Sequence, residues 1–134
     1  MNYWIIPANP NRYKLADVLR DMECVDWRQH NNFEIGDIVF LYNSKPDSQI
    51  LYKMEVIAVN LTGNETTSDR QYWINPSEYD TSMLHNRFFR MRPLAENTTD
   101  KLTLHDLYEL GLKGAPQGAL KVKEPLLGYI HSVL

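Results

Sequence analysis

The feature that most constrains the fold is a Gly-Asp pair followed directly by an uninterrupted apolar run. Gly36-Asp37 is a turn signal, and every residue from Ile38 to Tyr42 is apolar or aromatic. A short apolar run bounded by turn residues is typical of a strand that is covered on both faces. A Ser/Lys/Pro/Asp connection then leads to a second predicted strand. The chain therefore needs a central strand with packed elements on both faces, as in a small barrel.

Three more segments have strand character. Residues 50–59 alternate between an apolar face and a mixed one, and residues 3–6 are aromatic and β-branched. Residues 87–94 alternate again, with Phe89 and Met91 on one face. The first of these strands should end at Pro7. The polar stretch from residue 60 to residue 70 should be a mobile loop.

Helical spacing occurs in three places. Residues 14–22 repeat apolar side chains at helical intervals, so an amphipathic helix is predicted there. Thr103 and Asp106 form a helix-start signal, and Gly111 should end the helix that follows. A last helix should begin around Pro125, a tolerated proline of the first turn. This mixture of strands and helices indicates an α+β fold.

Composition limits the classes of function. With 134 residues, of which 43% are hydrophobic, the chain matches one ordinary domain over residues 1–134. A formal net charge of −3 argues against a protein that coats nucleic acid, because such binding depends on many phosphate contacts from Lys and Arg. Any contact with nucleic acid must therefore be local.

Metals, cofactors and membranes are not expected. Cys24 is the single cysteine, and the four histidines lack the spacing of metal ligands. No apolar run approaches the roughly 18 to 20 residues that a membrane span needs. The N-terminus has no basic region followed by an apolar one. We therefore expect a cytoplasmic protein with no membrane partner, no metal and no cofactor.

Four segments together resemble a known family. They are the opening Tyr3-Trp4-Ile5-Ile6-Pro7-Ala8-Asn9-Pro10, the Gly36-Asp37 turn, Tyr42-Asn43-Ser44 and residues 50–56, which end in Glu-Val. In order and spacing they resemble the EVE domain of the PUA-like group, whose relatives include the YTH readers of methylated adenine. The resemblance implies a PUA-like mixed β pseudo-barrel flanked by helices. The departures are Asn43, where many relatives have His, and Lys53, where many have a small or apolar residue.

The C-terminal part adds a second resemblance. Residues 111–118 and Tyr129-Ile130 are similar to the tail of EVE-like modules that stand at the N-terminus of some modification-dependent restriction proteins. This resemblance implies that the partner is nucleic acid carrying a modified base, with DNA favoured over RNA. It also makes a nuclease domain or subunit a candidate partner.

A reader of modified bases needs flat apolar walls, because an extruded base loses its stacking energy and the pocket must return it. In YTH relatives a Trp forms one wall of the methyl-base cage, and the resemblance assigns that role to Trp27. Tyr72, Trp73 and Leu84 are the candidates for the second wall. In the alternative interpretation Trp27 packs its helix onto the barrel, and Trp73 or Tyr72 has a plain core or surface role. Trp4, inside the first strand, is expected in the core.

A base edge also needs hydrogen-bonding partners. Asn9 resembles an Asn that faces the base edge in YTH relatives, and an amide can both donate and accept. Asn43 and Ser44 end the central strand at the same end of the barrel. Arg28 completes this base-binding set. Asn9, Asn43 and Ser44 are equally compatible with ordinary turn chemistry.

Basic residues in predicted loops surround the mouth of the barrel. Arg12, Lys45 and Arg70 are the candidates for phosphate contacts, although each alone is more often a solvated charge. Three arginines between residues 87 and 92 follow one strand. They form either a second basic strip or the solvated face of that strand.

These features favour a binding module that recognises a methylated or otherwise modified base in an aromatic pocket, without a catalytic residue. An RNA-modification reader is one alternative. A small amidohydrolase is another, because Lys53 and Glu55 share a strand face and resemble the Lys and Glu of ASCH-type amidohydrolases in the same group. A nucleophile with an adjacent base is otherwise lacking. A protein-interaction module would instead be marked by an exposed apolar patch.

Overall fold

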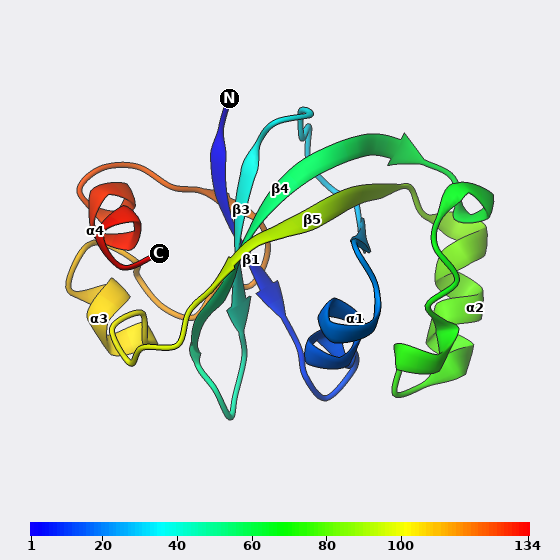
Figure 1. Cartoon of the computed structure of the whole chain (residues 1–134), viewed down its shortest axis with the longest axis horizontal. Coiled ribbons are helices and arrows are strands. Elements are labelled where there is room, and N and C mark those ends of the chain that lie inside the picture. The colour runs from blue at the N-terminus through cyan, green and yellow to red at the C-terminus, as the bar shows by residue number, and fades with distance from the viewer.

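One mixed sheet runs through the computed structural model, which describes residues 1–134. The sheet has six strands in the order β2-β5-β4-β3-β1-β6. It curls into a half-barrel with helices at both ends of the molecule (Figure 1). The strands are β1 (Tyr3–Ala8), β2 (Val25–Arg28), β3 (Ile38–Asn43), β4 (Gln49–Leu61), β5 (Phe88–Glu96) and β6 (Leu120–Lys121).

The helices fall into two groups. They are α1 (Leu15–Asp21), α2 (Pro76–His85), α3 (Leu104–Tyr108) and α4 (Leu126–Val133), with short 3-10 turns η1 (Gly63–Glu65) and η2 (Arg70–Tyr72). Helices α3 and α4 lie together at one end of the molecule, and α1 and α2 lie at the opposite end (Figure 1). The sheet stands between the two groups.

Strand β3 lies at the centre of this arrangement, as its apolar run predicts. It pairs with β1 in parallel and with β4 in antiparallel orientation, and all six of its residues are buried. Val39 and Leu41 point into one hydrophobic cluster, whereas Phe40 and Tyr42 point into another. The strand is therefore covered on both faces, and the prediction is confirmed.

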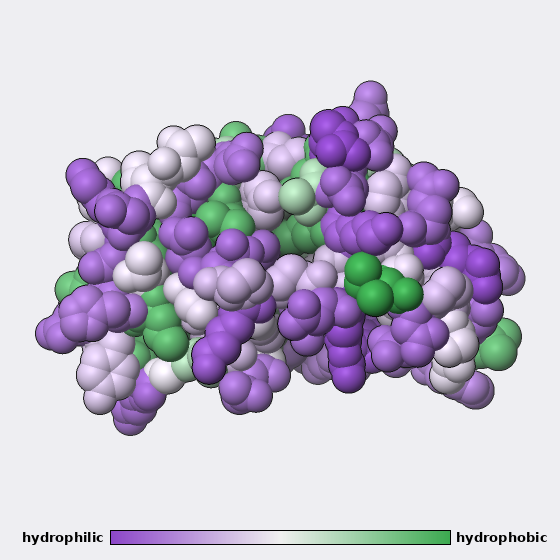
Figure 2. All heavy atoms as spheres, turned by 90° about the horizontal axis from the view of Figure 1, so that it is seen from below, coloured by the Kyte–Doolittle hydropathy of each residue, from purple (hydrophilic) through white to green (hydrophobic).

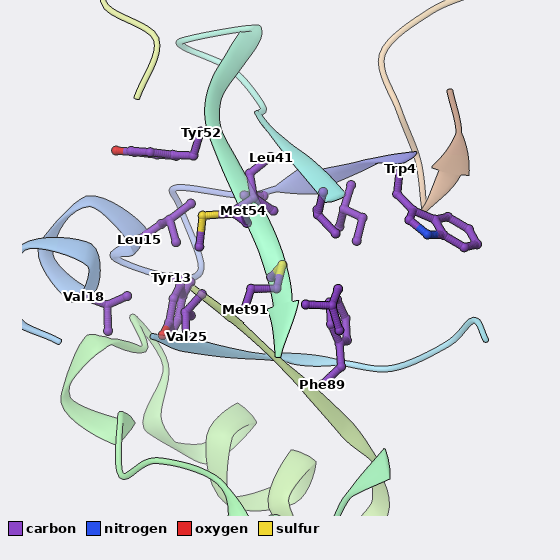
Figure 3. Close-up of a cluster of buried hydrophobic side chains, with 14 of the residues drawn as sticks. Trp4, Tyr13, Leu15, Val18, Val25, Leu41, Tyr52, Met54, Phe89 and Met91 are labelled. Carbon is purple, nitrogen blue, oxygen red and sulfur yellow. The ribbon is translucent and has the colours of Figure 1, made fainter. Parts of the chain in front are cut away.

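The first cluster fills the face of β1 and β3 that α1 and β2 cover. Figure 3 shows Leu41, Met54 and Met91, from β3, β4 and β5, near its middle, with Trp4 at one end. Trp4 is buried and its indole N–H donates to Asp37 Oδ2 at 3.0 Å. The prediction of a core position for Trp4 is therefore confirmed.

The second cluster lies on the other face of β1 and β3. Leu107 of α3 and Ile130 of α4 are fully buried there against Phe40. Thr103 caps α3 with the reciprocal hydrogen bonds to Asp106 that the sequence predicts. The predicted helices at residues 14–22, after Thr103 and around Pro125 are all present.

Several boundaries differ from the predictions. Strand β1 continues through Pro7 to Ala8, because β6 pairs only with Trp4 and Ile5 and no partner on that side needs the missing N–H of Pro7. Strand β4 extends to Leu61, and η1 and η2 follow it where the sequence predicts a plain loop. Strand β2 and helix α2 were not predicted at all.

None of the helices is long and apolar enough to cross a membrane. The longest, α2, has ten residues and is largely polar.

Candidate functional site

A large cavity opens beside the C-terminal end of β1. It has a volume of about 1020 Å³ and lies between the loop after β1, strand β2, the β3–β4 connection and helix α2. The face seen in Figure 2 is largely hydrophilic, with small apolar areas visible between polar side chains. The site residues predicted from the sequence that line the cavity are Asn9, Arg12, Trp27, Arg28, Ser44, Lys45 and Trp73.

Three aromatic rings form one wall of this cavity. The Tyr13 ring lies edge-on to Trp27, with 5.6 Å between centroids and 86° between planes. It makes a similar contact with Trp73, at 5.9 Å and 82°. Trp27 and Trp73 are only partly buried and pack against the first cluster. Both indoles therefore join the core on one side and line the cavity on the other.

A buried carboxylate holds this wall in place. Asp69 accepts a hydrogen bond from the Tyr13 hydroxyl at 2.7 Å and another from the Trp73 indole N–H at 3.3 Å. Burial raises the pKa of the Asp69 carboxyl above its ordinary value, although both hydrogen bonds oppose that shift. The pKa of Tyr13 is raised as well, first by burial and then by the charge of Asp69. Fixed hydrogen bonds of this kind restrict ring rotation and preorganise the wall.

Strand β2 positions Trp27, and a buried ion pair positions β2. Asp26 is 3% exposed and pairs with Arg90 of β5 at 2.8 Å. It also accepts from the backbone N–H and the hydroxyl of Thr67. The next residue, Trp27, pairs with Phe89 in the register between β2 and β5. Val25 and Trp27 alternate with Asp26 and Arg28, but the strand has only four residues, the shortest alternation that indicates a strand.

Two polar residues stand at the rim with free hydrogen-bonding groups. Asn9 Oδ1 accepts from the backbone N–H of Asn11 at 2.9 Å, an Asx turn. Its Nδ2 donates to no group of the protein. Ser44 is fixed through its backbone N–H, which donates to the carbonyl of Ala8 at 2.9 Å. Both the amide of Asn9 and the hydroxyl of Ser44 can therefore bind a ligand.

The rim carries an excess of positive charge. Arg12, Arg28 and Lys45 line the cavity and take part in no ion pair. Of the two acidic residues on the lining, Asp26 is neutralised by Arg90 and only Glu78 is unpaired. An acidic protein therefore presents a locally basic mouth, which suits a ligand with a negative backbone.

Helix α2 forms the wall opposite the β2 side and was missed by the sequence analysis. Ser77, Glu78, Thr81 and Ser82 line the cavity from this helix. A helix this polar has no apolar periodicity to reveal it. A start signal was available, because the Asn75 side chain caps the helix and Pro76 occupies its first position.

Four predicted site residues do not line the cavity. Tyr72 is buried in the first cluster, where its hydroxyl donates to Asp21, and Asn43 is buried at the end of β3. Leu84 is 80% exposed on α2. Arg70 forms a bidentate pair with Asp80. The proposed contacts of these four residues with a ligand in this cavity therefore lack a geometric basis.

The residues of the amidohydrolase alternative also lie elsewhere. Lys53 and Glu55 are on β4 and neither lines the cavity. Glu55 is paired with Arg92 of β5. A strand-face ion pair therefore accounts for Glu55, and the structure gives Lys53 no ion-pair partner.

Comparison with solved structures defines the fold class. An ASCH protein from Zymomonas mobilis has a TM-score of 0.65 and 13% identity, covering 98% of this chain and 95% of that chain. A hypothetical protein from Leishmania major has a TM-score of 0.66 and 19% identity, covering 98% and 93%. A protein from Rhodopseudomonas palustris has a TM-score of 0.66 and 13% identity, covering 99% and 92%. These likenesses confirm the α+β PUA-like fold.

The family follows from the sequence itself. The family model of the EVE domain matches residues 2–124, so the chain belongs to the EVE family. EVE and ASCH domains are PUA-like, a group whose members often bind nucleic acids. A search of curated proteins found no match.

Proposed function

We propose that this EVE domain binds a modified base of nucleic acid in the cavity, with DNA as the favoured polymer. The observation that supports this most directly is the aromatic wall of Tyr13, Trp27 and Trp73 beside a basic rim. An aromatic surface stacks on any base, and each stacked base contributes about 1 to 3 kcal/mol. The volume of about 1020 Å³ is sufficient for a nucleotide.

Discrimination of a modified base follows from the same wall. A methyl group added to a base buries further apolar area against the indoles, which stabilises the complex by about 0.8 kcal/mol per carbon. A close-fitting apolar site discriminates one such group by roughly 10- to 200-fold. The free amide of Asn9 and the hydroxyl of Ser44 supply donors and acceptors for the base edge.

Fluorescence anisotropy with labelled oligonucleotides tests this proposal. We expect tighter binding to DNA that carries C5-methylated cytosine or N6-methylated adenine than to the same unmodified DNA. The dependence on salt should be shallow, with a log–log slope of about −2 to −3, because only three unpaired cations line the cavity. RNA of the same sequence serves as the second arm and decides between the two polymers.

One pattern of results would refute the proposal. If modified and plain oligonucleotides of both polymers bind equally at every salt concentration, the domain does not read a modification. A protein-interaction module would then be the better hypothesis.

A further inference from the structure

A second, smaller depression lies beside the cavity. It has a volume of about 230 Å³, and no apolar residue lines it. Its lining consists of Gln29, His30, Asn31, Asn32, Asn60 and Arg87. The depression has no Phe, Tyr or Trp, so it offers less stacking surface than the cavity. Its amides, imidazole and guanidinium suit a polar, negatively charged ligand.

The depression and the cavity are lined by residues that are neighbours in the chain. Arg28 and Phe88 pair across β2 and β5 and line the cavity. The neighbouring residues Gln29 and Arg87 line the depression, and the Gln29 backbone N–H donates to the Arg87 carbonyl at 2.8 Å. Successive Cα atoms are about 3.8 Å apart, so residues of the two linings lie within the reach of one nucleotide at this strand pair.

Arg87 differs from the two arginines that follow it along β5. Arg90 is paired with Asp26 and Arg92 with Glu55, whereas Arg87 takes part in no ion pair. The carboxyl of Glu65 has its pKa lowered first by hydrogen bonds from Thr62 and more weakly by the charge of Arg87. No carboxylate lines the depression. The guanidinium of Arg87 is therefore available to an anion.

The polar groups of the depression are held in fixed positions. Gln29 Nε2 donates to the Asn31 carbonyl and to Asn60 Oδ1, both at 3.2 Å. Gln29 Oε1 accepts from the Asn60 backbone N–H at 2.8 Å. Asn60 has a φ of 57°, a left-handed conformation that Asn tolerates well. The side chains of His30 and Asn32 make no hydrogen bond within the protein and remain free.

We propose that this depression binds the sugar–phosphate backbone flanking the base that the cavity holds. The inference rests on the proposed function, and it adds a path for the nucleic-acid strand across the protein surface. From the cavity the backbone passes Arg28 and reaches Arg87 beside His30 and Asn32. Arg, Asn and Gln side chains are common ligands of phosphate and sugar oxygens, and such contacts set the register of the bound strand.

The test compares Arg87→Gln with Arg92→Gln. Both variants remove one positive charge from the same segment of the chain, but only Arg87 lines the depression. The probes are a C5-methylated deoxycytidine nucleoside and a single-stranded oligonucleotide with that base at its centre. If wild type prefers N6-methylated adenine, the corresponding nucleoside and oligonucleotide are used instead. Fluorescence anisotropy measures the affinity for the labelled oligonucleotide. The affinity for the nucleoside is measured by its competition with that oligonucleotide.

We expect Arg87→Gln to weaken oligonucleotide binding by about threefold to tenfold at low salt and to reduce the salt slope by about 1. Nucleoside binding should stay unchanged, because the nucleoside does not reach the depression. Arg92→Gln should alter neither.

Four results would overturn the inference. Equal effects of the two variants would mean that Arg87 acts only through net charge. An equal loss of nucleoside and oligonucleotide binding would place Arg87 at the base. No effect of Arg87→Gln, while Trp27→Ala abolishes the preference for the modified base, would refute the backbone path and leave the proposed function intact. If wild type shows no preference for either modified probe, both proposals fail together.

Discussion

The two faces of the central strands carry cores of different chemistry. The second cluster, under α3 and α4, is mainly aliphatic and has Phe40 and Tyr42 as its buried aromatic residues. The first cluster has six buried aromatic residues: Trp4, Tyr13, Phe33, Tyr52, Tyr72 and Phe89. Three of these, Trp4, Tyr13 and Tyr72, donate hydrogen bonds to aspartates.

On the proposed function, the first face contributes to recognition and the second mainly to stability. Aliphatic side chains pack in well-defined rotamers and need no polar partner. Two short helices are therefore enough to cover the second cluster. Aromatic residues with a polar end can stand at the boundary between core and solvent when that end is hydrogen-bonded. Asp69 provides such a bond for Tyr13 and Trp73, which line the cavity from the first face. Tyr42 and Leu104, which belong to the second face, also border the cavity.

The largest effect is expected from Phe40→Ala, which tests the role of the second cluster. Phe40 is fully buried, and its truncation should lower the free energy of unfolding by about 3 to 5 kcal/mol. Urea unfolding measures this change, and Leu84→Ala, at a site 80% exposed, should stay within about 0.5 kcal/mol of wild type. The folded variant should keep its oligonucleotide affinity. If the fully folded Phe40→Ala variant binds the oligonucleotide more weakly than wild type does, the two faces are not independent.

Trp27→Ala tests the first face. Removing one stacking wall should cost about 1 to 3 kcal/mol of binding, or roughly fivefold to more than a hundredfold in affinity. Because Trp27 is only partly buried, its loss should destabilise the fold less than Phe40→Ala does. Anisotropy and a melting curve on the same sample separate the two effects. If Trp27→Ala loses as much stability as Phe40→Ala does, and its folded fraction binds the oligonucleotide with wild-type affinity, Trp27 is a packing residue.

The same contrast explains how far the sequence could predict the fold. Strand β3 was found because burial on both faces leaves a continuous apolar run. Strand β4 was found because burial on one face leaves an alternating apolar pattern. The helices that cover the second cluster were found through Thr103 and Pro125, which mark their starts. Both signals depend only on neighbouring residues.

The two unpredicted elements beside the cavity, β2 and α2, carry weaker apolar patterns. β2 has four residues and includes Asp26, whose partner Arg90 is 64 residues away in the sequence. α2 faces the cavity with hydroxyl and carboxylate groups. The resemblance to a family placed Trp27 and Trp73, and the structure brings both to one cavity. The family resemblance could not reveal that Tyr13 contacts both indoles, because these contacts depend on how the β1–α1 loop folds against the rest of the chain.

Asp69→Asn sharpens the comparison through pH. The pKa of Asp69 is raised by burial from its ordinary value near 3.8, so the folded protein retains this proton where the unfolded chain has lost it. This contribution to stability is present below the ordinary pKa and is lost as the pH rises through the raised value. In Asp69→Asn that loss should disappear, because an amide does not ionise.

Urea unfolding at a series of pH values upward from 3.8 measures this difference between the two proteins. Asp80→Asn is a control of opposite sign, since the hydrogen bond from Arg70 lowers the pKa of Asp80. Parallel pH profiles for wild type and Asp69→Asn would mean that Asp69 titrates in the folded state as it does in the unfolded chain.

The smallest effect is expected from Lys53→Ala, which tests whether the outer face of β4 has any part in function. Lys53 does not line the cavity and forms no ion pair, so its truncation should change affinity by less than about twofold and stability by less than about 0.5 kcal/mol. The enzymatic alternative makes the opposite prediction. If wild type releases acetate from acetylated cytidine and Lys53→Ala does not, Lys53 is part of a catalytic site, and the domain is more than a binding module.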